Sequence, residues 1–360
     1  MMPKIIIIFL HYIYKMKKTI SKILIIYTGG TIGMIRDPET DMLKPFDFNN
    51  ILYEVPELKR MDCNIEAISF QEPIDSSNIN SKIWKKIGDY IYKYYNNFDG
   101  FVILHGTDTM AYTASAMSFM FVNLSKPIIF TGSQLPIGTI RTDGKENLIT
   151  AVEIATKKDD NGLPKLKEVA IYFENKLFRA NRTTKISSDN FNAFQSFNYP
   201  VLAEAGINIK FNSDALLNIP LKELEYNDNF DNSIGTVLFF PGIDISHIEY
   251  ILKHKNYRAI ILITYGSGNV PISKELIDAI KKAIVNNKII LNISQCLAGA
   301  VDQKNYETGR QLYNAGVIGV YDIILEALIT KLMICLAKTK NINTVKELLL
   351  DNMLGEFTKN

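Results

Sequence analysis

The sequence predicts an α/β protein with two domains, each built on a largely parallel sheet flanked by helices. Two observations support this fold class. Apolar, β-branched runs alternate along the chain with segments of helical period, and the runs end in turns rich in Gly, Ser or Thr. The length of 360 residues is long for one small domain and suits two.

The first domain is expected to span residues 20–211. Its strands are predicted within four continuously apolar runs, a pattern typical of buried parallel strands: 22–33, 98–110, 126–136 and 168–177. Two segments between them, 81–97 and 113–124, carry apolar residues at a spacing of three to four and predict helices.

A polar, irregular stretch over residues 212–233 is the predicted linker, and a second domain is expected over 234–360. Its predicted strands lie in 235–244, 257–269 and 288–296, and its predicted helices in 273–287, 326–339 and 344–352. Ligands of open parallel sheets bind beyond the carboxyl ends of the strands. The polar loops at those ends are therefore where chemistry is expected.

Residues 1–19 are interpreted as an N-terminal extension. A chain that began at Met16 would have a more usual N-terminus for this domain. Residues 1–15 therefore represent either a wrongly assigned translation start or a disordered extension. The apolar stretch is interrupted by His11, is shorter than a bilayer span and lacks a small-residue cleavage site. The competing interpretation is a short membrane anchor or a poor signal peptide; we expect no membrane association.

The composition is that of an ordinary globular protein, with 47% hydrophobic and 22% charged residues and a net charge of +2. This balance gives no reason to expect a nucleic acid as partner. The three cysteines, Cys63, Cys296 and Cys335, are far apart and show no metal-ligand spacing. An odd number suits no simple disulfide framework, so a reducing, cytoplasmic compartment fits best.

The first loop of interest is YTGGTIGM, Tyr27 to Met34. It matches neither the dinucleotide fingerprint nor the phosphate loop, which needs a lysine. Gly29 and Gly30 allow the backbone to bend sharply and leave Thr31 at a strand end beside free N–H groups. A hydroxyl with such donors could attack a carbonyl and hold its oxyanion. The alternative is a tight turn whose threonines cap a helix.

The second loop, HGTDT, places Thr107 directly beside Asp108 at the end of another predicted strand. A threonine nucleophile needs a base. His105 precedes the loop and is expected to pack with the strand as a neutral side chain. Lys185, in RANRTTKISSDNF, could lose its proton in a partly desolvated crevice and act as a base, although a loop lysine is usually a solvated charge.

A third polar stretch, EPIDSSNIN, offers Asp75, Ser76 and Ser77 just before a predicted helix. These side chains could bind the ammonium and carboxylate groups of a substrate. Equally, any of them could serve only as a helix N-cap.

Taken in chain order from Lys22 onward, YTGGTIGM, DGFVILHGTDTMAYTASA, TGSQLP, NRTTK, YGSGN and AGVIG resemble the bacterial asparaginase family in its type I, cytoplasmic form. The resemblance implies hydrolysis of L-asparagine to L-aspartate and ammonia through an acyl-enzyme, with neither cofactor nor metal. Its nucleophile falls on Thr31 and not on Thr28. Backbone N–H groups would stabilise the oxyanion.

The resemblance also assigns roles to the other loop residues. Thr107 would position or activate water, Lys185 would be the base, and Asp108 would bind the α-amino group of the substrate. Asp75, Ser76 and Ser77 would hold its amino-acid end. The family forms dimers or tetramers in which a neighbouring chain completes the site, so a homodimer or homotetramer is expected. Asn269, Tyr306 and Glu307 are candidates for that contribution, and ordinary loop polarity is the alternative.

Two departures from the family pattern stand out. Family members commonly carry a lid tyrosine shortly after the nucleophile, but no tyrosine lies between Thr31 and Tyr53, and Leu43 or its neighbours occupy that stretch. Some type I enzymes also have a second asparagine site with an arginine just before the YG.GN loop. Here Ile263 stands in that stretch, and we expect no strong activation by asparagine.

Other functions stay open at this point. The chain could be a glutaminase-leaning amidase or the asparaginase-like component of a tRNA amidotransferase. The second is disfavoured because the chain lacks a basic excess and a sizeable extra N-terminal domain. A non-catalytic amino-acid sensor on the same scaffold is a further alternative, which the missing lid tyrosine favours. A nucleotide-binding module would need phosphate-loop chemistry that is absent.

Overall fold

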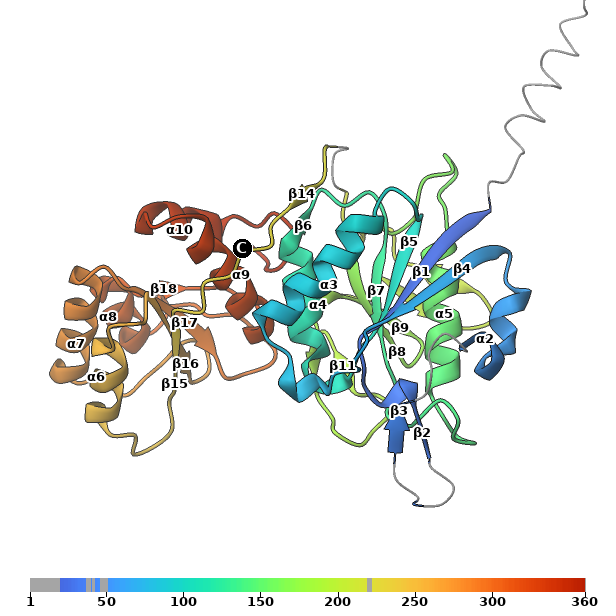
Figure 1. Cartoon of the computed structure of the whole chain (residues 1–360). Helices are drawn as coiled ribbons and strands as arrows, with labels where there is room; N and C mark the ends of the chain where they lie inside the picture. The colour runs from blue at the N-terminus through green and yellow to red at the C-terminus, as the bar shows by residue number, and fades with distance from the viewer. Residues whose placement is uncertain (1–19, 37–39, 41–42, 46–50, 219–221, 360) are drawn as a thin grey trace, which may run out of the picture.

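Two separate sheets organise the chain (Figure 1), in a computed structural model that describes residues 20–36, 40, 43–45, 51–218 and 222–359. The N-terminal half holds an eight-stranded sheet and the C-terminal half a four-stranded one. The predicted two-domain α/β fold with largely parallel sheets is confirmed. The extension 1–19 lies outside the described residues, and the domain boundaries stay a prediction.

The larger sheet has the strand order β13-β12-β9-β8-β7-β5-β1-β4. Its strands are β1 (Ser21–Tyr27), β4 (Cys63–Ser69), β5 (Gly100–Leu104), β7 (Ile128–Thr131), β8 (Val169–Phe173), β9 (Lys176–Arg179), β12 (Ala203–Ala205) and β13 (Ile209–Phe211). The strands β4, β1, β5, β7 and β8 pair in parallel, whereas the pairings β8–β9, β9–β12 and β12–β13 are antiparallel. Because β1 pairs with both β4 and β5, the strand order reverses beside β1, and ligands of such sheets bind at that point.

Helices cover both faces of this sheet: α2 (Ile51–Glu54), α3 (Ser81–Tyr94), α4 (Met110–Met120) and α5 (Gly144–Thr156). Side chains alternate along β1, so Leu24 and Ile26 pack with α3 and α4, whereas Ile23 and Ile25 pack with α5. Asn80 caps α3 by accepting hydrogen bonds from the N–H groups of Lys82 and Ile83.

The structure differs from the sequence analysis at the end of one helix and within the predicted linker. The helix expected over 113–124 ends at Met120, where β6 (Phe121–Val122) begins. That short strand pairs with β14 (Glu225–Tyr226), which lies within the predicted linker. The linker is therefore partly strand, because its backbone finds hydrogen-bonding partners on the N-terminal half; its residues 219–221 lie outside the described ones.

The smaller sheet has the order β15-β16-β17-β18, all parallel: β15 (Ile234–Leu238), β16 (Ala259–Thr264), β17 (Ile289–Ser294) and β18 (Ile318–Gly319). One face is covered by α6 (Ile245–Lys253), α7 (Lys274–Val285) and α8 (Glu307–Ala315). On the other side, α9 (Leu325–Lys338) lies against α4 of the N-terminal half, and α10 (Ile342–Leu350) packs on α9 (Figure 1).

Short elements complete the description. The antiparallel pairs are β2 (Met34–Arg36) with β3 (Leu43–Pro45) and β10 (Thr184–Lys185) with β11 (Phe194–Gln195). The 3-10 helices are η1 (Thr31–Gly33), η3 (Pro56–Arg60), η4 (Ser76–Asn78), η5 (Thr107–Thr109) and η6 (Ala180–Arg182).

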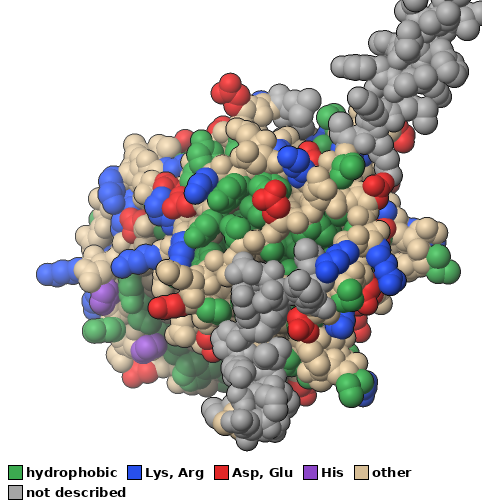
Figure 2. All heavy atoms as spheres, turned by 45° about the vertical axis from the view of Figure 1, so that its right-hand side comes forward, with side chains coloured by type: hydrophobic (Ala, Val, Ile, Leu, Met, Phe, Trp, Pro, Cys, Tyr) green, Lys and Arg blue, Asp and Glu red, His purple; other side chains and the backbone are tan. Residues whose placement is uncertain are grey.

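The surface in Figure 2 carries acidic and basic side chains interspersed, with an apolar area near its centre. No large area of this face bears a single sign of charge among the described residues. Within the same part of the chain, none of the helices has the length and apolar character needed to cross a bilayer.

Candidate active site

Three loops at the carboxyl edge of the larger sheet pack directly on one another. A Cβ on Gly30 would lie 2.5 Å from the Cα of Gly106, and one on Gly29 would lie 2.1 Å from the carbonyl oxygen of Ile74. The first-loop glycines, Gly29 and Gly30, also have positive φ, +133° and +90°. Only glycine fits such a close approach of backbones. Thr31 and Thr107, which follow Gly30 and Gly106, are thereby brought to adjacent loops.

The first loop presents Thr31 and buries Thr28. The Thr28 hydroxyl donates a 3.0 Å hydrogen bond to the carbonyl of Leu104 and is 2% exposed. Thr31 begins η1, is half-buried, and makes no side-chain hydrogen bond within the part of the chain that the structure describes. Tyr27 supports this loop because its hydroxyl donates to the carbonyl of Gly30. Of the two threonines, Thr31 therefore has the available hydroxyl.

Lys185 joins the second loop through two polar contacts. Its Nζ donates to Thr107 Oγ1 at 2.9 Å and to Asp108 Oδ1 at 2.6 Å. The lysine side chain is 15% exposed, whereas that of Asp108 is 66% exposed. The structure thus brings Lys185 to Thr107 and Asp108, although 77 positions separate Asp108 from Lys185 along the chain. A hydroxyl held by an amine at hydrogen-bond distance is the geometry that proton transfer requires.

The third loop places Asp75, Ser76 and Ser77 unequally. Asp75 is exposed and caps η4, because its carboxylate accepts a hydrogen bond from Ser77 N–H at 2.9 Å. Ser76 is buried beside the second loop, where a Cβ on Gly106 would lie 2.6 Å from its Oγ. Its carbonyl accepts a hydrogen bond from Thr109. Ser77 is exposed. Capping is therefore one role of Asp75, and a role in binding stays a prediction.

His105 is a buried residue of the strand end. It is 1% exposed, its Nδ1 lies 2.7 Å from the Gly106 carbonyl oxygen, and its ring packs edge-on to Phe130. Burial lowers the pKa of His105 to about 4. The neutral packing role expected from the sequence agrees with this environment.

Gln134 is a member of the site to which the sequence patterns assigned no role. Its Oε1 accepts a 3.4 Å hydrogen bond from Thr107, and its Nε2 donates to the carbonyl of Asn190. The signal was present in TGSQLP, a polar loop that follows a third parallel strand at the same edge of the sheet.

Family models match nearly the whole chain. One described as "Asparaginase, N-terminal" covers residues 22–217, and one described as "Glutaminase/Asparaginase C-terminal domain" covers 233–349. This chain belongs to the asparaginase family.

Individual relatives of this asparaginase-family chain agree with that assignment. It is 39% identical to L-asparaginase 1 of Escherichia coli (strain K12), over 94% of this chain and 98% of that protein. It is 31% identical to the L-asparaginase of Thermococcus kodakarensis, over 94% of this chain and 99% of that protein. The crystal structure of L-asparaginase I from Vibrio cholerae matches with a TM-score of 0.85 at 38% identity, covering 95% of this chain and all of that one (100%).

The residues expected to serve a neighbouring asparaginase chain gather on the C-terminal half. Asn269 Oδ1 accepts a 2.6 Å hydrogen bond from Thr308, in the first turn of α8, which Tyr306 and Glu307 begin. Tyr306 is 58% exposed. Across the described residues, no side-chain hydrogen bond links this group to Thr31, Thr107 or Lys185. A contribution to the site of another chain stays a prediction.

The residues that the sequence analysis compared with the lid and with the second asparagine site of the family lie in two different regions. The lid stretch is only partly described: β2 pairs with β3, which includes Leu43, but residues 37–39, 41–42 and 46–50 lie outside the described residues. The other region is a pocket of about 180 Å³ between the two halves, lined by Ile263 and Cys296 among others. Neither lysine nor arginine occurs among the described residues that line it. The absence of strong activation by asparagine stays a prediction.

The polar atoms at the site are hydroxyl, amine, carboxylate and amide groups of the chain itself. Within the described residues, His, Cys, Asp and Glu side chains form no group of three or more that could hold a metal ion.

Proposed function

We propose that this chain hydrolyses L-asparagine to L-aspartate and ammonia through an acyl-enzyme on Thr31. The observation that carries this proposal is the contact of Lys185 with Thr107 and Asp108, in the loop that packs against the glycines before Thr31. It supplies a hydroxyl, an amine and a carboxylate beside a second, available hydroxyl. Membership of the asparaginase family supports the same reaction.

The first half of the proposed reaction is acyl transfer. Thr31 Oγ1 attacks the side-chain amide carbon of asparagine, and its proton passes by way of Thr107 to Lys185. Backbone N–H groups stabilise the oxyanion of the tetrahedral intermediate. The carbon–nitrogen bond then breaks, and the nitrogen leaves as ammonia after taking up the proton that Lys185 had accepted, which returns Lys185 to its neutral form. An ester between Thr31 and the aspartyl group remains.

The second half is hydrolysis of that ester. Thr107 positions a water molecule, Lys185 accepts its proton, and the hydroxide oxygen attacks the ester carbon. Breaking of the carbon–oxygen bond returns the proton to Thr31 and releases aspartate. Asp108 would bind the α-ammonium group, while Asp75, Ser76 and Ser77 would hold the amino-acid end of the substrate.

The assembly and compartment follow from the same proposal. The chain would act as a homodimer or homotetramer, with Asn269, Tyr306 and Glu307 contributing to the site of a neighbouring chain. Cys63, Cys296 and Cys335 are all free thiols, which fits a reducing, cytoplasmic compartment.

Ammonia release from asparagine and from glutamine, by wild type and Thr31→Ala, tests the proposal. Wild type should release ammonia from asparagine, and Thr31→Ala should lose release by several orders of magnitude while keeping its fold, because the attacking atom is gone. Lys185→Met should also abolish turnover, since it removes the amine and keeps much of the bulk.

Contrary outcomes would point to a different nucleophile or to a different function. Undiminished turnover in Thr31→Ala would exclude it as nucleophile. Faster release from glutamine than from asparagine would make the chain a glutaminase-leaning amidase. No release from either amide, together with measurable asparagine binding, would favour an amino-acid sensor.

A further inference from the structure

Two carboxylates from the C-terminal half bind the segment immediately before Lys185. Asp322 and Glu326 lie four residues apart, at the end of the connection after β18 and in the first turn of α9. They bind Arg182 and Thr184, respectively. Lys185 is the next residue along the chain.

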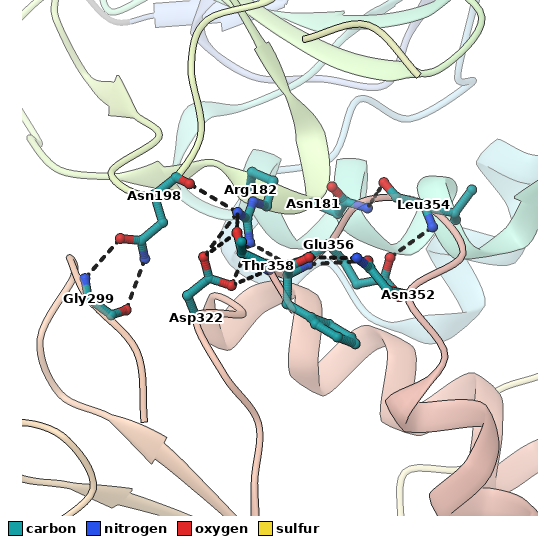
Figure 3. A network of polar contacts seen from close by, with 10 residues as sticks. Asn181, Arg182, Asn198, Gly299, Asp322, Asn352, Leu354, Glu356 and Thr358 are labelled. Carbon is teal, nitrogen blue, oxygen red and sulfur yellow. Dashed lines mark hydrogen bonds and ion pairs between the residues drawn. The ribbon is translucent and has the colours of Figure 1, made fainter. Parts of the chain in front are cut away.

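Arg182 is the more deeply buried of the two bound residues. Its side chain is 1% exposed, and its two terminal nitrogens donate to both oxygens of Asp322, at 2.9 and 3.1 Å (Figure 3). The same guanidinium donates to the carbonyls of Asn198 and Glu356 and to the hydroxyl of Thr358. A bidentate pair of this kind fixes orientation as well as distance.

Thr184 provides the second attachment. Its hydroxyl donates a 2.5 Å hydrogen bond to Glu326 Oε1, and the threonine is 8% exposed. Glu326 is 9% exposed, so this contact is shielded from solvent. A hydrogen bond in a buried setting is less weakened by water than one at the surface.

The backbone links both attachments to Lys185. Thr183 between them is extended, with φ −118° and ψ 132°. Arg182 and Thr184 face the C-terminal half, as their contacts with Asp322 and Glu326 show. Thr184 and Lys185 form β10, and successive side chains of a strand point to opposite sides. Lys185 then faces the other way, toward Thr107 and Asp108. Holding residues 182 and 184 therefore fixes the point from which the lysine extends.

We propose that Asp322 and Glu326 are positioning residues for Lys185, acting through Arg182 and Thr184. This inference rests on the proposed function, in which Lys185 is the base. The long, flexible lysine side chain must keep its amine within hydrogen-bond distance of a hydroxyl for proton transfer. A displacement of about 1 Å can reduce a rate about 100-fold, so the attachment of the preceding residues matters for turnover.

The matched pair Thr184→Val and Thr184→Ser tests the link to Glu326. Valine keeps the shape of threonine and removes the hydroxyl, whereas serine keeps the hydroxyl. We expect Thr184→Val to lower kcat for asparagine by about 10- to 100-fold with KM changed less than about twofold. Thr184→Ser should stay within about threefold of wild-type kcat, because the donor to Glu326 remains.

Two substitutions of Glu326, the acceptor of the Thr184 hydrogen bond, test the same link. Glu326→Gln keeps a carbonyl oxygen that can accept from Thr184, and Glu326→Leu does not. The first should retain most of the wild-type kcat, and the second should resemble Thr184→Val. Asp231→Asn is the control, because Asp231 pairs with Arg258 at the opposite end of α9, where Arg258 also donates to Leu336 O. It should leave kcat within about twofold.

Labelling of Lys185 by a small amine-selective reagent, measured by mass spectrometry on folded protein, provides a readout independent of turnover. Thr184→Val should label severalfold faster than wild type and Thr184→Ser, because the amine is held less firmly by Thr107 and Asp108. Equal labelling and equal kcat in the valine and serine variants would overturn the positioning role. Failure of wild type to release ammonia would instead count against the proposed function, while the labelling rates still decide the positioning.

Discussion

His105 shows how burial alone separates a packed histidine from a catalytic one. The residue lies two positions before Thr107, yet its ring is enclosed at the strand end and binds the neighbouring carbonyl. Burial disfavours the imidazolium, so the folded protein keeps the ring neutral where free histidine would be protonated. Its charge state therefore affects stability.

The pKa of about 4 predicts an acid-sensitive contribution to stability. Because the folded pKa lies below the ordinary value of 6.5, the contribution is complete above pH 6.5 and is lost as the pH falls toward 4. It amounts to at most about 3 kcal/mol. His105→Asn keeps a donor near the Nδ1 position and removes the titration. Urea unfolding from pH 7 to 4.5 should show a smaller loss of stability in the variant, and equal losses would contradict the prediction.

At the candidate site, the sequence was sufficient to single out residues that lie in a recognisable local motif. Thr31 and Thr107 follow glycines at strand ends, and the order of the parallel strands places both loops at one edge. The assigned roles of these residues stay predictions. The partners of Gln134 and Thr184 could not be predicted, because those contacts join segments that only tertiary packing brings together.

The C-terminal segment after α10 is attached to α9 through a buried ion pair. Glu356 is 0% exposed, and its Oε1 accepts a hydrogen bond from Lys331 Nζ, on α9, at 2.5 Å. Lys331 also donates to the carbonyls of Leu349 and Asp351. Its ammonium thus has three acceptors, but the carboxylate alone balances its charge.

Removing that carboxylate should destabilise the protein strongly. We expect Glu356→Gln to lower the free energy of unfolding by about 3 kcal/mol, because it leaves an uncompensated buried ammonium. Lys331→Met combined with Glu356→Gln should recover part of the loss. Glu249→Gln breaks the exposed Lys253 pair and should cost less than about 1 kcal/mol. Chemical denaturation measures all three, and a Glu356→Gln effect as small as that of Glu249→Gln would contradict the argument.

Strands that form continuous apolar runs could be predicted from the sequence, whereas strands and helix ends without such a run could not. The buried strands β1, β5, β7 and β16 read as apolar runs. The edge strand β4 alternates half-buried and exposed residues from Cys63 to Ala67, a strand pattern that a search for continuous apolar runs does not find. The end of α4 was missed because Phe121 and Val122 continue its apolar composition, although their backbone pairs with β14.

For the whole molecule, the decisive feature is a core shared by both halves. One continuous cluster includes Met117 of α4, Phe101 of the larger sheet, and Leu328 and Leu332 of α9. The two sheets are thus joined through apolar packing of α4 on α9 and not through the linker alone. Separate unfolding of either half would expose that surface to water.

We therefore expect a single cooperative thermal transition. Scanning calorimetry should give one endotherm, and Leu332→Ala should move it to lower temperature, with a loss of about 2 to 5 kcal/mol of stability, without splitting it. Tyr250→Ala is the control, because Tyr250 is 70% exposed and its loss should change stability by less than about 0.5 kcal/mol. Two resolved endotherms in wild type would show that the halves unfold independently.

The contacts of Arg182 also constrain when the protein becomes competent during its synthesis. Its partners Asp322 and Thr358 are 140 and 176 residues further along the chain. At translation speeds of about 5–20 residues per second, the ribosome needs roughly 10 to 35 s to make that stretch. Until then Asp322 is not available to pair with the Arg182 guanidinium, so Arg182 cannot be buried as an ion pair. The segment that carries Lys185 then lacks its contacts with the C-terminal half. With Lys185 as the proposed base, we expect no turnover from a nascent chain until the residues that bind Arg182 have emerged.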